Sequence, residues 1–223
     1  NYLREWLSHS NLLDLVNNSL KGKYSFIDNF DYFGKDSNKK LKAYPKGVVG
    51  HWIAGNVPIL GFFSLVQGIL SKNINIVRVS RSFGNVLPRI LNLFSNVDFV
   101  SKGGCNVLGS DLLKTLAVVY YDKEEIEIGN KISRYVDVRV VWGGKDAVEA
   151  IQSLKKGIDC VDIIFGPKYS FAIIDNNNLE NTKQMNNLTQ KLAFDISAHQ
   201  QRGCNSPHTV FVEESNKFSI QDF

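Results

Sequence analysis

The sequence has little of several features that would identify a class of protein directly. Its 223 residues include only 3 cysteines, 5 prolines and 1 methionine. Cys105, Cys160 and Cys204 are too few for a disulfide scaffold and lack the spacing of metal ligands. We therefore expect reduced thiols, no bound metal and a cytoplasmic location.

Long apolar runs and runs of one charge are also missing. The most apolar stretch, residues 57–70, contains Pro58, Ser64 and Gln67, and is shorter than the roughly 18 to 20 residues of a membrane span. The net charge is +4, but the lysines are scattered and form no basic helix, so we expect no membrane span and no nucleic-acid partner. The N-terminus has neither an initiating Met nor the organisation of a signal peptide, so we expect a chain that belongs to something longer.

What is present is typical of a globular α/β protein. Residues are 43% hydrophobic and 22% charged, and short β-branched runs alternate with helical patterns. This alternation predicts a Rossmann-like, mostly parallel sheet covered by helices. The expected strands are 48–54, 74–80, 97–101, 116–121, 138–142, 161–165, 171–174 and 210–212, and the expected helices 58–70, 86–94, 122–134, 146–156 and 188–202.

The same pattern suggests a division of the chain. Residues 1–43 read as N-terminal helices, capped between them at Ser10-Asn11, and an irregular connection. Residues 44–200 form the main domain, and residues 201–223 begin another.

Three expected strands end in small or polar residues that precede a helix, at residues 54–58, 79–82 and 142–146. Ligands of open α/β sheets bind at such carboxyl ends. The third end offers Gly143 and Gly144 before a helix N-terminus, an arrangement that favours a phosphate group. None has the GxGxxG or Walker pattern, so glycines that serve only tight turns remain an alternative.

Cys204 lies where a helix is expected to give way to a strand. The helix ending at Arg202 is followed by Gly203, which favours the left-handed conformation of many helix ends. A thiol at such an element edge is accessible to a substrate. It is either a nucleophile or a packing residue.

Five segments together resemble the aldehyde dehydrogenase superfamily. Residues 44–50 (YPKGVVG) with 56–58 (NVP) are similar to its "PLGVVG…PWN(F/Y)P" region, and 76–81 (IVRVSR) lie at its strand ending in "KPSE". The other three matches are 141–145 (VWGGK) at "FTGS", 164–168 (IFGPK) at "ELGGK", and 201–204 (QRGC) with 210–212 (VFV) at "GQ-x-C…VFV". Within this superfamily, the sequence of residues 55–73 looks most like those of the acyl-CoA reductases of bacterial bioluminescence.

The resemblance implies a role for each matching residue. Residues 44–200 would bind NAD(P), and residues 201–223 would begin the catalytic domain, whose remainder this sequence does not contain. Cys204 would attack an acyl thioester, and Asn56, with the Cys204 backbone N–H, would donate to the oxyanion. The cofactor would be held by Arg78, Ser80, Arg81, Gly143 and Gly144.

Two departures from the family pattern narrow the chemistry. Ile164 stands where hydrolytic members have a Glu that activates water, which favours acyl transfer and reduction over acid formation. Ser80 and Arg81 stand at the end of "KPSE", where the family Glu binds the adenosine ribose and would repel a 2′-phosphate. Arginine pairs well with phosphate, so we expect NADPH rather than NADH, and an Arg81→Glu change should shift the preference towards NADH.

The resulting expectation is an NADPH-dependent reductase that converts an acyl-CoA or acyl-protein thioester to an aldehyde through a thioester on Cys204. An acyl-activating partner enzyme and a homo-oligomer are further expectations. Two alternatives stay open, namely a CoA-acylating aldehyde dehydrogenase acting on a short-chain aldehyde and a nucleotide-binding domain without catalysis.

Overall fold

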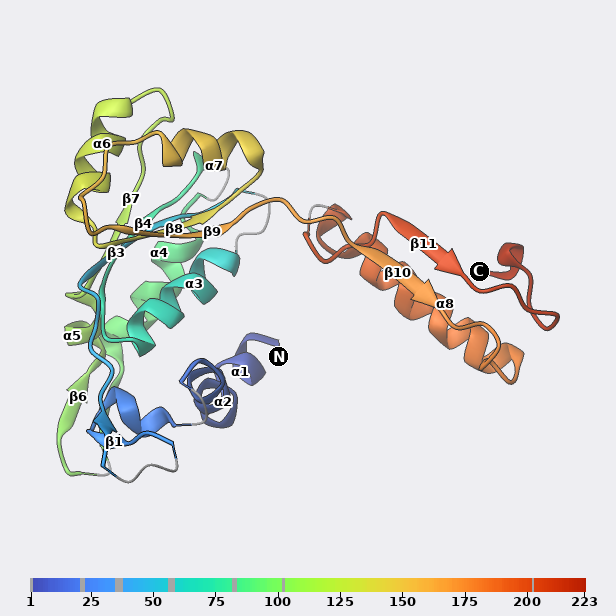
Figure 1. Ribbon diagram of the computed structural model, residues 1–223, viewed down its shortest axis with the longest axis horizontal. Helices are drawn as coiled ribbons and strands as arrows, with labels where there is room; N and C mark the ends of the chain where they lie inside the picture. The colour runs from blue at the N-terminus through green and yellow to red at the C-terminus, as the bar shows by residue number, and fades with distance from the viewer. Residues whose placement is uncertain are drawn as a thin grey trace.

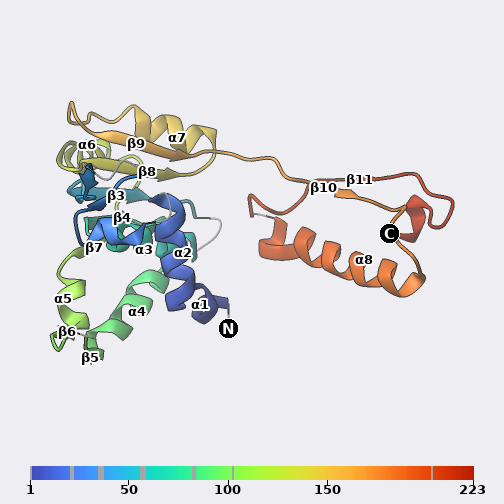
Figure 2. The same cartoon turned by 60° about the horizontal axis from the view of Figure 1, so that its bottom comes forward.

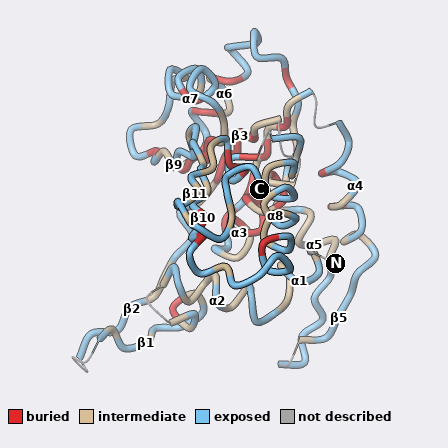
Figure 3. Tube along the Cα trace, turned by 90° about the vertical axis from the view of Figure 1, so that its right-hand side faces the viewer, coloured by how far each residue is buried: buried red, intermediate tan, exposed pale blue. Residues whose placement is uncertain are grey.

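The computed structural model describes residues 2–20, 23–34, 38–55, 59–81, 84–101, 103–201 and 203–223. It shows a main body and a smaller C-terminal unit that extends away from it (Figure 1). Buried residues concentrate in the main body, around its sheet, whereas most of the C-terminal unit is exposed or half-buried (Figure 3).

The main body is organised around a parallel sheet of five strands, which confirms the predicted fold class. In chain order the strands are β3 (Val48–Trp52), β4 (Ile74–Arg78), β7 (Leu116–Val119), β8 (Val138–Trp142) and β9 (Val161–Phe165). Their order across the sheet is β7-β4-β3-β8-β9, and each neighbouring pair is parallel. The chain therefore builds outward from β3 first in one direction and then in the other, as in doubly wound nucleotide-binding folds.

Helices cover both faces of this sheet (Figure 2). On one face, α3 (Ile59–Leu70) and α4 (Val86–Asn92) supply the core residues Phe62, Leu65 and Leu87, which pack against Val77 and Val79. On the other face, α6 (Ile126–Tyr135) and α7 (Lys145–Gln152) pack against a core that contains the buried residues Trp52, Val136 and Cys160.

A buried polar chain runs beneath α3. Nδ1 of His51 lies 2.8 Å from Ser64 Oγ, and Nε2 lies 3.0 Å from Asn75 Oδ1. Trp142 Nε1 donates to Ser64 Oγ at 3.2 Å, and Asn75 donates to the carbonyl of Asn73 at 2.7 Å. Since Asn75 Oδ1 can only accept, the consistent assignment is a neutral His51 with its proton on Nε2 and Nδ1 accepting from Ser64.

A buried ion pair joins β8 to β9. Arg139 is 1% exposed, and its Nε and Nη2 donate to the two carboxylate oxygens of Asp162 at 2.6 and 2.8 Å. Nη1 donates to Ser133 Oγ and to the carbonyls of Ile151 and Leu154. One guanidinium therefore fastens α6, the end of α7 and the edge strand together.

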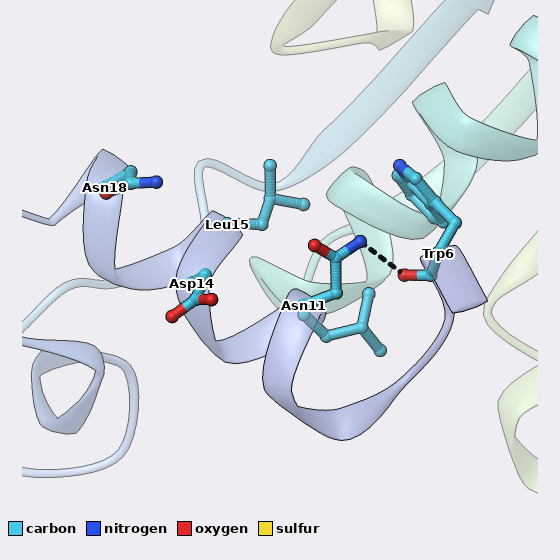
Figure 4. Close-up of a pocket in the computed structure, with 6 residues that line it drawn as sticks. Trp6, Asn11, Asp14, Leu15 and Asn18 are labelled. Atoms are coloured by element: carbon cyan, nitrogen blue, oxygen red, sulfur yellow. Dashed lines mark hydrogen bonds between the residues drawn. The ribbon is translucent and has the colours of Figure 1, made fainter.

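The N-terminal helices α1 (Tyr2–Trp6) and α2 (His9–Ser19) pack on α3 through Trp6, whose ring centroid lies 4.2 Å from that of Phe63. The N-cap of α2 is Ser8, not the predicted Ser10-Asn11, because the Ser8 hydroxyl accepts from the Asn11 N–H. A small pocket of about 180 Å³ lies here, lined by Trp6, Asn11, Leu12, Asp14, Leu15 and Asn18 (Figure 4). It contains none of the predicted site residues.

Two antiparallel hairpins lie outside the five-stranded sheet. β1 (Asp31–Tyr32) pairs with β2 (Lys40–Leu41), and β5 (Asp98–Val100) pairs with β6 (Asn106–Leu108), which leads into α5 (Gly109–Leu113). β5 lies within the expected strand 97–101, whereas the other three strands were not predicted. The first hairpin lies within the segment expected to be irregular, and strands of two or three residues are too short for an alternating pattern to be visible in the sequence. Short 3₁₀ turns lie at Tyr24–Ile27, Leu93–Asn96, Ala198–Gln201 and Ile220–Asp222.

The C-terminal unit is a strand–helix–strand arrangement of β10 (Phe171–Ile174), α8 (Thr182–Ser197) and β11 (Thr209–Val212). β10 pairs in parallel with β11, and forms no pairing with the five-stranded sheet. Ile174 and Met185 are buried within it, whereas Phe171, Ile173 and Phe211 are exposed. We expected β10 and α8 in the main domain, but they group with β11.

Four helices differ in extent from the prediction. α8 begins at Thr182 instead of 188 because the Asn181 side chain caps it, accepting from the Gln184 N–H at 3.0 Å. α7 ends at Gln152 rather than 156, where Arg139 takes up its last carbonyl groups. α4 begins at the predicted Val86 but ends at Asn92 rather than 94, where a 3₁₀ turn follows, and α6 begins at Ile126 after a turn that starts at Asp122.

Among the described helices, none is both long enough and apolar enough to cross a membrane.

Candidate functional site

The strand order has a switch point at the carboxyl ends of β3 and β8. These two strands are neighbours, but their following connections lead to opposite sides of the sheet. Such a switch point is where open α/β sheets bind ligands. The segment after β3 and the Gly143-Gly144 turn after β8 therefore lie at the same edge of the sheet.

The Gly143-Gly144 turn has the features of an anion site. A Cβ atom on Gly143 would lie 2.9 Å from the Cβ of Ala147, so the close approach of turn and helix requires glycine there. Gly144 is the N-cap of α7 and gives it no side-chain hydrogen bond, while a Cβ on Gly144 would meet open space. The first-turn N–H groups of α7 can thus face a phosphate, although the carboxylate of Asp146 in the same turn opposes an anion.

The predicted adenosine-binding residues lie at the end of β4, but they are arranged differently from one another. Arg78 is the last residue of the strand, and its Nη2 donates to the carbonyl of Tyr121 at 3.0 Å. Arg81 is exposed on the loop that follows, and Ser80 lies half-buried between them. The structure therefore directs Arg78 inwards, towards Tyr121, and leaves Arg81 at the surface.

Cys204 is exposed, as expected, on a tightly held turn. The Ser206 N–H donates to the Gly203 carbonyl at 3.1 Å, and the Ser206 hydroxyl donates to the carbonyl of Ala198 at 3.0 Å. The Ser170 hydroxyl donates to the Cys204 carbonyl. Three hydrogen bonds thus fix the backbone around the thiol while the residue itself remains accessible.

The backbone before this turn is strained. Gln200 and Gln201 have φ angles of 56° and 58°, in the left-handed region that costs a non-glycine residue free energy. The prediction that Gly203 ends the helix was wrong, since α8 ends at Ser197 and a 3₁₀ turn, Ala198–Gln201, follows it. Strain of this kind is commonly stored at functional sites, and the role of Cys204 as a nucleophile stays a prediction.

The two candidate sites are joined through β9. The Gly143 N–H donates to the carbonyl of Phe165, the last residue of that strand, at 3.2 Å. Ser170, which contacts the Cys204 carbonyl, comes five residues later, and its own carbonyl accepts from the His208 N–H at 2.9 Å. The thiol turn is thus tied to the segment 166–170, through which the chain leaves β9.

Aromatic residues support this edge. Trp142 stacks on Phe165 with ring centroids 3.9 Å apart and planes 10° from parallel. Trp52 is buried and donates from Nε1 to the Tyr121 hydroxyl at 2.8 Å. Both tryptophans are wall or core residues, as expected.

The remaining site predictions have mixed outcomes. Asn56, the predicted oxyanion donor, lies outside the described residues, so its role stays a prediction. Ile164 lies in β9, and its correspondence to the family Glu stays a prediction. Within the described ranges, no three His, Cys, Asp or Glu residues gather as a metal site.

Sequence reasoning missed Tyr121, Ser170 and the two strained glutamines. Tyr121 acts through its backbone carbonyl and ring, and Ser170 through a contact to a residue 34 positions away. No local pattern marks such contacts. The residues that are present nevertheless suit a nicotinamide dinucleotide. The N-terminus of α7 has no side-chain cap and can face a phosphate, and the exposed Arg81 follows β4, which is separated from β8 by β3 alone.

Comparisons with known proteins show a family match over the whole chain. The family described as Acyl-CoA reductase (LuxC) matches residues 1–223. The chain is 29% identical over 211 residues to the long-chain acyl-protein thioester reductase of Photorhabdus luminescens and 31% identical over 211 residues to that of Aliivibrio fischeri. Each alignment covers 94% of this chain and 40% of the relative, so the chain spans about two fifths of their length.

Solved structures show the same fold. AldH of Staphylococcus aureus in a substrate-bound state has a TM-score of 0.58 at 14% identity, covering 96% of this chain and 44% of that chain. The glyceraldehyde-3-phosphate dehydrogenase GapN of Methanocaldococcus jannaschii, complexed with NADP, has a TM-score of 0.60 at 15% identity, covering 91% and 41%. The fold is that of aldehyde dehydrogenases, and the chain belongs to the acyl-CoA reductase (LuxC) family.

Proposed function

We propose that this chain binds NADPH at the carboxyl edge of its five-stranded sheet and accepts an acyl group on Cys204, for reduction to an aldehyde. The observation that carries the proposal is that the Gly143 N–H donates to the Phe165 carbonyl and the Ser170 hydroxyl donates to the Cys204 carbonyl, at the two ends of one short segment of chain. A glycine turn suited to an anion and an exposed thiol are thus each tied to residues 165–170. The relatives named long-chain acyl-protein thioester reductases support an acyl thioester as the substrate.

The acyl transfer follows from the chemistry of the thiol. The Cys204 thiolate attacks the carbonyl carbon of the incoming thioester, a new C–S bond forms, and the C–S bond to the donor breaks. The donor leaves as a thiolate and takes up a proton from solvent. The Cys204 backbone N–H and the Asn56 side chain are the proposed donors to the oxyanion. NADPH, when bound, supplies the hydride that releases the acyl group as aldehyde and frees the thiol.

Ile164 supports reduction over hydrolysis. Its side chain cannot accept a proton from water, so no general base stands at this position of β9. An acyl group on Cys204 would then persist until it is reduced. We propose that this apolar position protects the acyl-enzyme.

The domain boundary follows from the strand pairing. We propose that the second domain begins in the linker 166–170 and not at residue 201, because β10 and α8 group with β11. The thiol then lies inside the second domain, on the side nearer the sheet. A homo-oligomer, an acyl-activating partner enzyme and a cytoplasmic location stay predictions.

Mass spectrometry tests the proposed acyl transfer. The native gene product is incubated with a long-chain acyl-CoA, and we expect an added acyl mass that hydroxylamine removes. Cys204→Ala should abolish the adduct. Cys105→Ala is the matched control, because Cys105 is also an exposed free thiol but lies on the β5–β6 hairpin, and this variant should keep the adduct. Adding NADPH should release a long-chain aldehyde from the wild-type protein.

Two results would contradict the proposal. An adduct that survives in Cys204→Ala would place the nucleophile elsewhere. Binding of NADPH with no adduct on any cysteine would leave a nucleotide-binding domain without catalysis.

A further inference from the structure

The ends of β4 and β7 are joined by an unusual set of contacts. Arg78 pairs in register with Val119, the last residue of β7, and the chain continues into Tyr120 and Tyr121. The guanidinium carbon of Arg78 lies 5.2 Å from the centre of the Tyr121 ring, and Nη2 donates to the Tyr121 carbonyl at 3.0 Å. Arg78 therefore holds Tyr121 by both its ring and its backbone.

Tyr121 is held from a third side by the central strand. Trp52, at the end of β3, donates from Nε1 to the Tyr121 hydroxyl at 2.8 Å, and both residues are buried. These contacts thus hold the carboxyl ends of β3, β4 and β7 together. Removing Arg78 would release the segment that follows β7.

The Arg78 side chain is poorly placed to contact a ligand. Its Nε is buried and, among the described residues, has no hydrogen-bond partner. An atom that solvent does not reach is closed to a phosphate as well. With Nη2 already bound to Tyr121, Arg78 has lost the open fork that makes arginine a bidentate phosphate ligand.

Arg81 differs in each of these respects. It lies three residues further on, outside β4, and its side chain is exposed. Within the described ranges, no carboxylate forms an ion pair with it. Its guanidinium is therefore available beside the carboxyl ends of β4 and β7, the region that we call the rim.

Tyr120 and Asp122 form the other side of this rim. The Tyr120 hydroxyl donates to Asp122 Oδ1, and this hydrogen bond raises the pKa of Tyr120 while the charges of Arg81 and Arg78 oppose the rise. Tyr120 is 49% exposed. Among the described residues, the rim thus presents the exposed guanidinium of Arg81, the ring of Tyr120 and the carboxylate of Asp122, whose lone pairs are partly taken up.

We infer that the two arginines have separate tasks: Arg81 contacts the 2′-phosphate of the dinucleotide and determines the preference for it, whereas Arg78 is a positioning residue. Arg78 fixes Tyr121 and so places Tyr120 and Asp122 along the rim. The inference rests on the proposed function, because it assigns roles within the proposed nucleotide site. It also revises the expectation that both arginines contact the cofactor.

Binding of two nucleotide fragments separates these roles. Adenosine 2′,5′-bisphosphate and 5′-AMP differ only in the 2′-phosphate, and their dissociation constants are measured by calorimetry for each variant. Arg81→Glu should weaken the bisphosphate by about 10- to 100-fold, as expected for loss of a charged hydrogen bond, and leave 5′-AMP nearly unchanged. The same variant should shift the NADPH-to-NADH affinity ratio towards NADH.

Changes at Arg78 should give a different signature. Arg78→Gln should weaken both fragments by the same factor, because it displaces the rim without removing the phosphate contact. Arg78→Lys should recover part of that loss, since an ammonium group can still donate to the Tyr121 carbonyl. Arg89→Glu, at an exposed position of α4, matches the charge change of Arg81→Glu and should leave the ratio of the two fragments close to that of the wild type.

The outcomes distinguish this inference from the proposed function. A wild-type protein that binds neither fragment nor either dinucleotide would overturn both. A wild-type protein that binds them, with Arg78→Lys losing only the bisphosphate, would overturn the separation of tasks alone. Arg78→Lys also serves as the readout if Arg78→Gln fails to fold.

Discussion

Replacing Asp162 with Asn is expected to lower the free energy of unfolding by about 3 to 5 kcal/mol, the usual cost of removing one partner from a buried ion pair. The guanidinium of Arg139 is 1% exposed and would lose both charged hydrogen bonds. Asparagine has nearly the same shape, so the loss is electrostatic and not a cavity effect. Since whole domains are stable by about 5 to 15 kcal/mol, this change is large enough to unfold much of the main body.

Urea unfolding followed by circular dichroism measures this effect, and two variants serve as controls. Asp159→Ala removes an exposed carboxylate from the loop before β9 and should change stability by less than about 0.5 kcal/mol. Lys156→Ala removes the half-exposed second partner of Asp162 and should cost less than about 1 kcal/mol. A loss below 1 kcal/mol in Asp162→Asn would show that Arg139 finds other partners.

The same pair predicts an acid dependence. The hydrogen bonds from Arg139 hold the pKa of Asp162 below its ordinary value of 3.8, so the folded state favours the charged form. This stabilisation is complete above about pH 4 to 5 and is lost as the pH falls through the lowered folded value. Asp162→Asn should remove that part of the acid dependence.

His51→Leu is expected to cost about 2 to 4 kcal/mol, because it leaves the Ser64 hydroxyl and Asn75 Oδ1 buried without their partner. Leucine has a similar volume, so the space beneath α3 stays filled. Ser64 would keep the N–H of Trp142 as a donor but would have no acceptor in place of His51 Nδ1. Trp142, at the end of β8, would therefore also be held less firmly by Ser64.

This histidine further makes stability depend on pH near neutrality. Burial lowers the pKa of His51 from its ordinary value of 6.5, so the unfolded chain takes up a proton before the folded one does. Stability is complete above about pH 7 and falls as the pH drops below 6.5, by up to about 1.4 kcal/mol per pH unit, until the folded value is passed. Urea midpoints at pH 7.5 and 5.5 should differ in the wild type and converge in His51→Leu.

His9→Gln is the matched control for this titration. His9 is exposed at the start of α2, so the variant should keep the pH dependence of the wild type. A wild-type protein equally stable at both pH values would contradict the role assigned to His51.

Much of the main sheet could be predicted from the sequence. Val138–Trp142 and Val161–Phe165 are runs of apolar and β-branched residues, bounded by turns, and both are strands with the predicted limits. The Gly143-Gly144 turn and the exposed Cys204 were located for the same reason, since glycine pairs and a break between helix and strand are local signals.

Helix limits were predicted less well because tertiary contacts set them. The last long helix was predicted to begin at residue 188, but Asn181 caps it and α8 begins at Thr182. The α7 pattern continues to residue 156, but the guanidinium of Arg139 takes the carbonyls of Ile151 and Leu154 and the helix ends at Gln152.

By itself, the sequence determined the alternation of strands and helices, the turns at which phosphate and thiol chemistry can occur, and the family to which the residues point. Each of these depends on neighbours within a few positions, where periodicity and turn chemistry act. Only the tertiary structure decided that Arg78 is bound to Tyr121, that His51 lies inside a polar chain, and that β10 pairs with β11. Those outcomes depend on hydrogen bonds between residues far apart in the chain, which no local pattern records.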